Sequence, residues 1–105
     1  MKEMIREFVY RMDNVSFAEL MHVIPNSAGQ RVIKLTNNDS LILWESVSAE
    51  FSQAIEDLVS EGQIVMKPCS VMVYAADREI PRYPIAKSVR EYAKPRWLPI
   101  VFRRP

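Results

Sequence analysis

The stretch from Ser48 to Tyr74 constrains the fold most, because it places a helix, a stop and two apolar runs in direct succession. A serine at position 48 can cap a helix start by accepting a hydrogen bond from an orphan backbone N–H. Gly62 follows the periodic run, where a residue that tolerates positive φ commonly ends a helix. The pattern therefore predicts a helix over residues 48–61. Its apolar face is formed by Phe51, Ile55, Leu58 and Val59.

Two short apolar runs come directly after this helix. Ile64–Lys67 and Val71–Tyr74 flank Pro68-Cys69-Ser70, whose composition is typical of a turn. Short apolar runs on either side of a turn predict a β-hairpin. We therefore expect the helix to lead straight into two antiparallel strands.

Two further helices are predicted near the N-terminus. Residues 2–12 alternate apolar and charged side chains at helical spacing. Ser16-Phe17-Ala18-Glu19 is a capping box, in which the serine caps the following turn and the glutamate reaches back to the serine backbone. Pro25 then ends this second helix at about Ile24, because the residue before a proline avoids helical geometry.

Residues 26–47 separate the second helix from the third. Arg31–Leu35 and Leu41–Trp44 are predicted to form two strands around the turn-forming cluster at 37–40. The run Leu41–Trp44 is apolar throughout, as in a strand that is covered on both faces. The alternative is a helix over residues 28–34, which Gly29 and the neighbouring β-branched pair disfavour.

The C-terminal part contains a possible helix and an apolar extended segment. Ile85–Ala93 has helical spacing, with Pro84 at the first turn and Pro95 after the end. Trp97–Phe102 is apolar, and Pro99 confines it to a sheet edge or an irregular path. A segment this apolar must pack either on its own domain or on a partner.

Charge is distributed unevenly along the chain, although the net charge is only +1. Residues 1–77 contain 6 Lys or Arg and 11 Asp or Glu, which gives −5, whereas residues 78–105 contain 8 and 2, which gives +6. A length of 105 residues predicts a single domain, with a body at 1–77 and a basic extension at 78–105 packed on it. The extension either docks on its own acidic body or contacts a polyanion such as nucleic acid.

The residues give little reason to expect an enzyme, a metal or a cofactor. Cys69 and His22 are the single cysteine and the single histidine, and no glycine-rich phosphate loop is present. One cysteine allows no intrachain disulfide, which fits the reducing cytoplasm. No apolar run approaches the length of a membrane span, and the N-terminus has no apolar signal core. We therefore expect a cytoplasmic protein that is not an enzyme.

The order of these elements resembles the winged-helix superfamily. The resemblance rests on Phe17-Ala18-Glu19-Leu20-Met21 in the second helix and on Ala54-Ile55-Glu56-Asp57-Leu58-Val59-Ser60-Glu61-Gly62-Gln63-Ile64, where an apolar helix, a glycine and an isoleucine lead into the wing. It implies an α+β winged-helix-like domain with three main helices, a β-hairpin inserted between the second and third helices, a C-terminal wing hairpin and a basic, proline-containing C-terminal extension. It also implies double-stranded DNA as a partner.

Two features depart from the superfamily pattern. A helix-turn-helix has a short turn between its last two helices, whereas residues 26–47 intervene here. The third helix carries acidic residues and no Lys or Arg, although a helix in a major groove needs donors toward phosphates and bases. DNA contact is therefore expected through the wing and the basic extension. The acidic residues of the third helix are Glu50, Glu56, Asp57 and Glu61.

The candidate site residues follow from these considerations. Aromatic residues are interleaved with the basic ones, and Tyr83, Tyr92 and Trp97 either stack on bases or anchor the extension in the core. The predicted nucleic-acid-binding residues are Lys67, Arg78, Arg82, Lys87, Arg90, Lys94 and Arg96.

The first functional hypothesis is a small DNA-binding or regulatory protein that contacts the phosphate backbone. The alternative is a winged-helix module for protein interaction or dimerisation that does not bind DNA. In that case the apolar C-terminal segment would meet a protein partner or a second copy. The predicted partner-binding residues are Trp97, Ile100 and Phe102.

Overall fold

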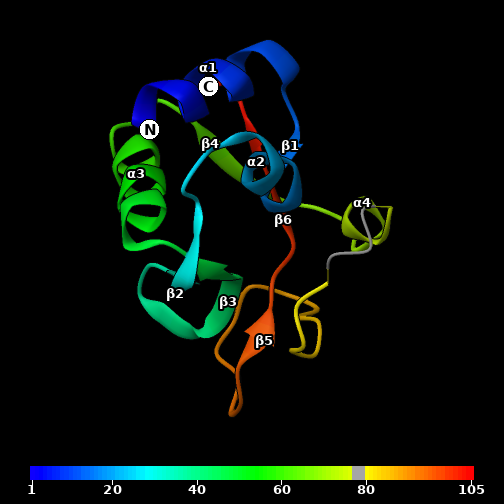
Figure 1. Ribbon diagram of the computed structural model, residues 1–105. Helices are drawn as coiled ribbons and strands as arrows, with labels where there is room; N and C mark the ends of the chain where they lie inside the picture. The colour runs from blue at the N-terminus through cyan, green and yellow to red at the C-terminus, as the bar shows by residue number, and fades with distance from the viewer. Residues whose placement is uncertain (77–79) are drawn as a thin grey trace.

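A computed structural model describes residues 1–76 and 80–105 and shows how the elements assemble (Figure 1). Over these residues the chain is a compact α+β domain with four helices and two three-stranded sheets. The helices are α1 (Lys2–Met12), α2 (Phe17–Val23), α3 (Ala49–Ser60) and α4 (Met72–Ala75). The strands are β1 (Val15–Ser16), β2 (Ala28–Leu35), β3 (Asn38–Val47), β4 (Val65–Pro68), β5 (Arg96–Trp97) and β6 (Ile100–Arg103).

The three predicted main helices are confirmed, and so are their end signals. The Ser16 hydroxyl accepts a hydrogen bond from the Glu19 backbone N–H at 3.0 Å, and the Glu19 carboxylate accepts one from the Ser16 N–H at 3.1 Å. The Ser48 hydroxyl accepts from the Phe51 N–H at 3.0 Å at the start of α3. Gly62 has a φ of 72°, as expected for the residue that turns the chain after this helix.

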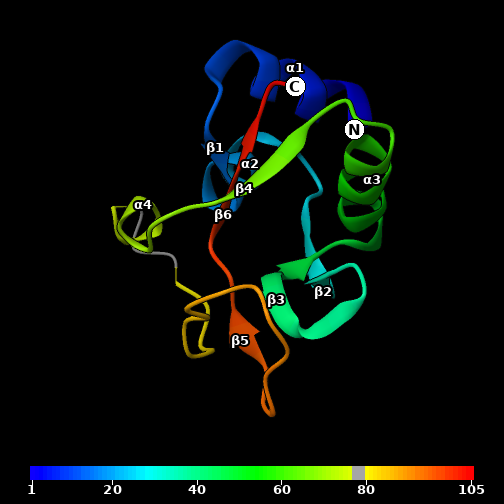
Figure 2. The same ribbon diagram turned by 180° about the vertical axis from the view of Figure 1, so that it is seen from behind.

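The first sheet has the order β1-β6-β4, and both of its pairs are antiparallel (Figure 2). Strand β4 therefore pairs with β6 from the end of the chain, and the predicted pairing of Ile64–Lys67 with Val71–Tyr74 is wrong. The second of these runs forms α4 instead. The Ser70 hydroxyl accepts a hydrogen bond from the Met72 N–H at 3.1 Å and starts that turn of helix.

Tyr74 explains why α4 forms where a strand was predicted. Its side chain is fully buried, and its hydroxyl donates to the Ile100 carbonyl at 2.6 Å and accepts from the Phe17 N–H at 3.0 Å. The ring also packs edge-on against Trp97, with the ring centroids 5.1 Å apart. These tertiary contacts outweigh the strand preference of the local sequence.

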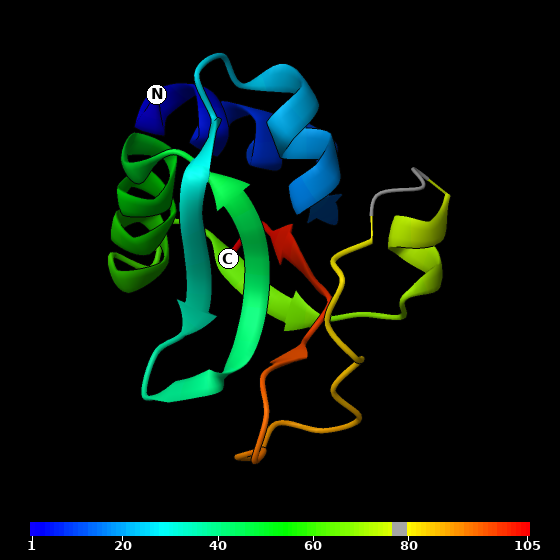
Figure 3. The same ribbon diagram turned by 60° about the horizontal axis from the view of Figure 1, so that its bottom comes forward.

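The second sheet has the order β2-β3-β5 and contains the predicted hairpin between the second and third helices (Figure 3). The hairpin is longer than expected, because it spans 28–47 and not only the two apolar runs. The run 41–44 is buried throughout, as predicted for a strand covered on both faces. Strand β5 adds to β3 in parallel, and this places the C-terminal part beside the hairpin.

The predicted helix at Ile85–Ala93 is wrong. Residue 85 forms an isolated parallel bridge to Trp97, and the backbone N–H groups of Lys87 and Ser88 both donate to the Tyr92 hydroxyl. The Ser88 carbonyl accepts from the Tyr92 hydroxyl and the Tyr92 N–H donates to the Ser40 hydroxyl, so the carbonyl and the N–H that a helix would join are both bonded elsewhere. The segment is therefore irregular and follows the edge of the second sheet.

Tyr74→Phe tests the contribution of the buried hydroxyl. Removing it leaves a backbone donor at Phe17 and an acceptor at Ile100 without this partner, so we expect a loss of about 1–3 kcal/mol in the free energy of unfolding. Urea denaturation measures this loss. Tyr10→Phe, on the exposed side of α1, should change stability by less than about 0.5 kcal/mol. Equal effects of the two variants would contradict the role assigned to Tyr74.

Gly29→Ala tests the close approach of β2 to the start of α3. A Cβ atom at Gly29 would lie 2.6 Å from the Ser48 Cα and 2.7 Å from the Val47 carbonyl oxygen. Because backbone atoms cannot give way cheaply, we expect a loss of about 2–3 kcal/mol in urea denaturation. Gly62→Ala meets no atom within 4 Å and is strained only by its φ, so it should cost about 1 kcal/mol. A smaller effect at Gly29 than at Gly62 would disprove the steric argument.

Candidate nucleic-acid interface

The candidate site lies mainly on one connected segment, residues 80–96, which we call the basic arm. The Trp97 N–H donates to the Pro84 carbonyl at 2.8 Å, and the Ala86 N–H donates to the Trp97 carbonyl at 2.8 Å. The basic arm thereby folds back along β5 on the side away from β3. It lies at the opposite end of the molecule from α1 and the two termini (Figures 1 and 2).

The start of β3 holds the part of the basic arm around Arg90 and Tyr92. The Tyr92 N–H donates to the Ser40 hydroxyl at 3.0 Å, and the Asn38 side-chain amide donates to the Arg90 carbonyl at 3.0 Å. The Ser40 hydroxyl in turn donates to the Asn38 side-chain oxygen at 2.6 Å. Two polar side chains at the start of β3 therefore fix the backbone of the basic arm.

Tyr92 organises the middle of the basic arm. Its hydroxyl accepts from the Lys87 and Ser88 N–H groups, each at 3.1 Å, and donates to the Ser88 carbonyl at 3.0 Å. The guanidinium carbons of Arg90 and Arg96 lie 4.4 and 4.7 Å from the centroid of the ring, within cation–π range. One aromatic side chain thus orders the backbone of a loop and positions two of its cations.

The basic arm concentrates positive charge. Among residues 80–96, Glu91 is the one acidic residue against five basic ones, which gives a net charge of +4. Arg82 is 83% exposed and its Nε lies 3.9 Å from the Glu45 carboxylate, a loose and solvated pair. The other four cations form no ion pair with a carboxylate of the described residues. The five basic residues are Arg82, Lys87, Arg90, Lys94 and Arg96.

Two of the predicted nucleic-acid-binding residues do not belong to the basic arm. Lys67 is exposed on β4 in the first sheet, where it lines a cleft of about 450 Å³ together with Arg103. Arg78 lies outside the described residues. Arg31 and Lys34, which could add phosphate contacts, are exposed on β2 in the same sheet as β5.

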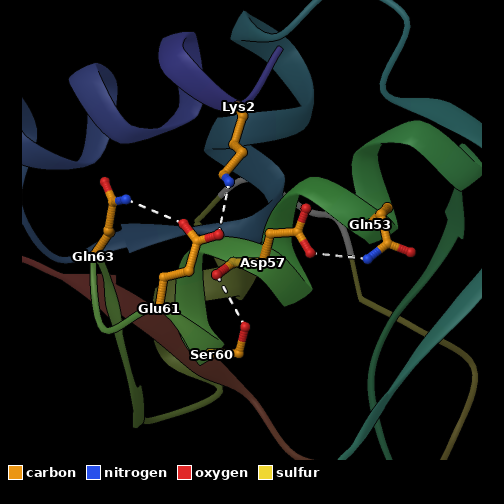
Figure 4. A network of polar contacts seen from close by, with 6 residues as sticks. All are labelled: Lys2, Gln53, Asp57, Ser60, Glu61 and Gln63. Carbon is orange, nitrogen blue, oxygen red and sulfur yellow. Dashed lines mark hydrogen bonds and ion pairs between the residues drawn. The ribbon is translucent and has the colours of Figure 1, made fainter.

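The solvent face of α3 is acidic and already engaged with neighbouring side chains (Figure 4). Glu61, at the end of α3, pairs with the Lys2 ammonium at 3.0 Å, and the Asp57 carboxylate accepts from the Gln53 amide at 2.9 Å. No Lys or Arg lies between Ala49 and Ser60. These carboxylates would repel a phosphate backbone, so α3 does not contribute to the positive potential of the domain.

The predicted partner-binding residues are buried, so this prediction is wrong. Trp97 and Phe102 are fully buried and Ile100 is 2% exposed, so all three belong to the core. The Trp97 indole N–H donates to the Leu43 carbonyl at 3.2 Å, which satisfies its polar group inside the domain. The apolar C-terminal segment therefore packs on its own domain, one of the two destinations that its sequence allowed. It offers no exposed surface to a partner.

Sequence reasoning missed the residues that hold the site together. Asn38 and Ser40 were assigned only to a turn, and Tyr92 was expected to stack on bases or anchor in the core. A pair of short polar side chains in a hairpin turn was the available signal, since such residues readily bond to backbone groups. Nothing in the local sequence indicates that their partner lies some fifty residues further along.

The remaining chemistry of the domain is sparse. Among the described residues, no group of three or more His, Cys, Asp or Glu side chains is placed to hold a metal ion. Burial raises the pKa of the Cys69 thiol, which lowers its fraction of reactive thiolate at neutral pH. None of the described helices has the length and apolar character needed to cross a membrane.

Comparison of the chain with protein-family models, with curated proteins and with solved structures found no match.

The Tyr92 hydroxyl should titrate below the ordinary value for a tyrosine. Its hydrogen bond with the Ser88 side chain, aided by backbone N–H groups and Arg90, lowers its pKa to about 8. Because the unfolded chain binds more protons between this value and the ordinary value of 10, the folded arm should gain stability as pH rises through this interval. Tyrosinate absorbance measures the titration, and Tyr92→Phe should remove the early phase. Identical titration curves for the unmodified chain and Tyr92→Phe below pH 9 would contradict the arrangement.

Proposed function

We propose that this chain is a winged-helix-like domain that binds double-stranded DNA through the phosphate backbone, with the basic arm as the main contact surface. The single observation that carries the proposal is the clustering of five exposed or half-exposed Lys and Arg residues on one fixed segment. Phosphate contacts from such side chains supply most of the affinity in non-specific DNA binding.

The order of elements supports the winged-helix part of the proposal. Helices α1, α2 and α3 follow one another around a sheet in which β1 lies after the first helix and β4 after the third. Strand β6 lies between these two strands and closes the sheet. The chain between β4 and β6, residues 69–99, then occupies the place of the wing. In this interpretation the basic arm is part of the wing.

The electrostatics indicate which surface would face DNA. The acidic α3 is unsuited to a major groove, whereas the basic arm presents its cations at the far end of the molecule (Figure 1). Backbone contacts of this kind position a protein on a duplex without reading its sequence. We therefore expect binding with little sequence preference and a steep dependence on salt concentration.

Fluorescence anisotropy with a labelled duplex tests the proposal. Between about 50 and 200 mM salt, the logarithm of the binding constant should fall linearly against the logarithm of salt, with a slope of about −3 to −5 for the available cations. Lys87→Ala combined with Lys94→Ala should weaken binding to any sequence and reduce the slope by about 2, or about 1 per lost phosphate contact.

Arg6→Ala combined with Arg11→Ala provides the matched control. It removes the same charge from α1, at the other end of the molecule, and should leave the binding constant and the slope nearly unchanged (Figure 1). Absence of binding at the lowest salt would overturn the proposal. Equal losses from the two double variants would show that net charge, and not the basic arm, is responsible.

A further inference from the structure

A groove between α3 and β2 is not used by the proposed DNA contact. It has a volume of about 550 Å³, and α3 and β2 lie side by side along it (Figures 1 and 3). Apolar side chains form much of its lining, including Ile33 from β2, Leu43 from β3 and Met66 from β4. Ile55 and Val59 contribute apolar surface from α3.

Strand β2 lines one side of this groove. The strand is at the edge of its sheet, since the order is β2-β3-β5. Val32, Ile33 and Lys34 all line the groove, although side chains of successive strand residues point to opposite faces. The register of β2 against β3 shifts on both sides of Ile33 and of Lys34, so the strand is irregular where it lines the groove, and among the described strands only β3 pairs with it. The N–H and C=O groups of such an edge are a template for an added strand.

The α3 side of the groove is acidic at Glu56, whereas Lys34 lines the groove from β2. Glu56 lines the groove from α3, and Glu50 and Asp57 lie on the same helix, which has no Lys or Arg. A ligand that enters the groove therefore gains from a positive charge beside Glu56. A strand edge, an apolar floor and an acidic wall together define the chemistry of the occupant.

We propose that this groove binds an extended segment of a partner protein, which adds as a strand to the free edge of β2. The segment has apolar residues at alternate positions, directed to the floor, and a Lys or Arg beside Glu56. Main-chain hydrogen bonds to β2 supply affinity, and the floor and the acidic wall supply specificity. This site is separate from the basic arm and does not depend on DNA binding.

Selection from a displayed library of random dodecapeptides against the full chain tests the proposal. The enriched peptides should alternate apolar residues and contain Lys or Arg, and synthetic copies should bind with saturation in fluorescence anisotropy. N-methylation at alternate residues of the best peptide should reduce affinity at least about tenfold in the register that faces β2, because it removes donors to the strand edge. No enrichment, or enrichment of peptides without this pattern, would overturn the proposal.

Two matched pairs of variants locate the binding. Ser52→Trp fills the groove, whereas Gln53→Trp places the same side chain on the solvent face of α3. Glu56→Lys reverses the acidic wall, whereas Glu50→Lys reverses a charge on α3 outside the groove lining. The first variant of each pair should reduce the affinity for the peptide at least about tenfold, a change of about 1.4 kcal/mol in binding free energy. The second variant should leave that affinity nearly unchanged. Equal losses within a pair would overturn the site.

Sedimentation of the full chain without peptide tests whether a second copy of the chain fills the groove. A monomer at all concentrations supports a foreign segment as the ligand. Self-association that Ser52→Trp and Glu56→Lys both abolish would show that a second copy fills the groove, and would overturn the assignment to a partner protein.

Discussion

The hydroxyl of Tyr74 joins three parts of the chain that are far apart in the sequence. It bonds to the backbone at the β1–α2 junction and to β6, while its own residue lies in α4. A buried polar group of this kind is stabilising only when its partners are in place, and it then fixes their mutual position. The course of the chain after β4 depends on this link, because it turns the backbone away from a simple hairpin and toward the basic arm.

The inserted hairpin and the basic arm depend on each other. The arm has few internal backbone hydrogen bonds. Asn38 and Ser40 at the start of β3, together with β5, supply the restraints that it lacks. The hairpin in turn gains β5 as a third strand, which covers the edge of β3. The inserted hairpin and the basic arm thus form one structural unit, which holds the cations of the arm in a defined place.

Local signals predicted the parts of the fold that local physics decides. The capping box at Ser16, the stop at Gly62 and the turn before β3 all specify structure within a few residues, and α1, α2, α3 and the hairpin follow from them. The pairing of β4 with β6 and the helical turn at Tyr74 depend on contacts across 26 or more residues, which no local pattern encodes. For the same reason the basic residues of the site could be predicted, whereas the side chains that hold them could not.

The central position of β6 also affects the order in which the domain can form during synthesis. Strands β1 and β4 both pair with residues 100–103 and not with each other. Until the ribosome has released those residues, both strands lack their ladder partner. Phe17 then lacks its edge-on contact with Phe102, and the Tyr74 hydroxyl lacks its acceptor at Ile100. The helices can form early, but closure of the core must wait for the last strand. Contacts of such long sequence separation make folding slow and leave apolar surface exposed to chaperones in the meantime.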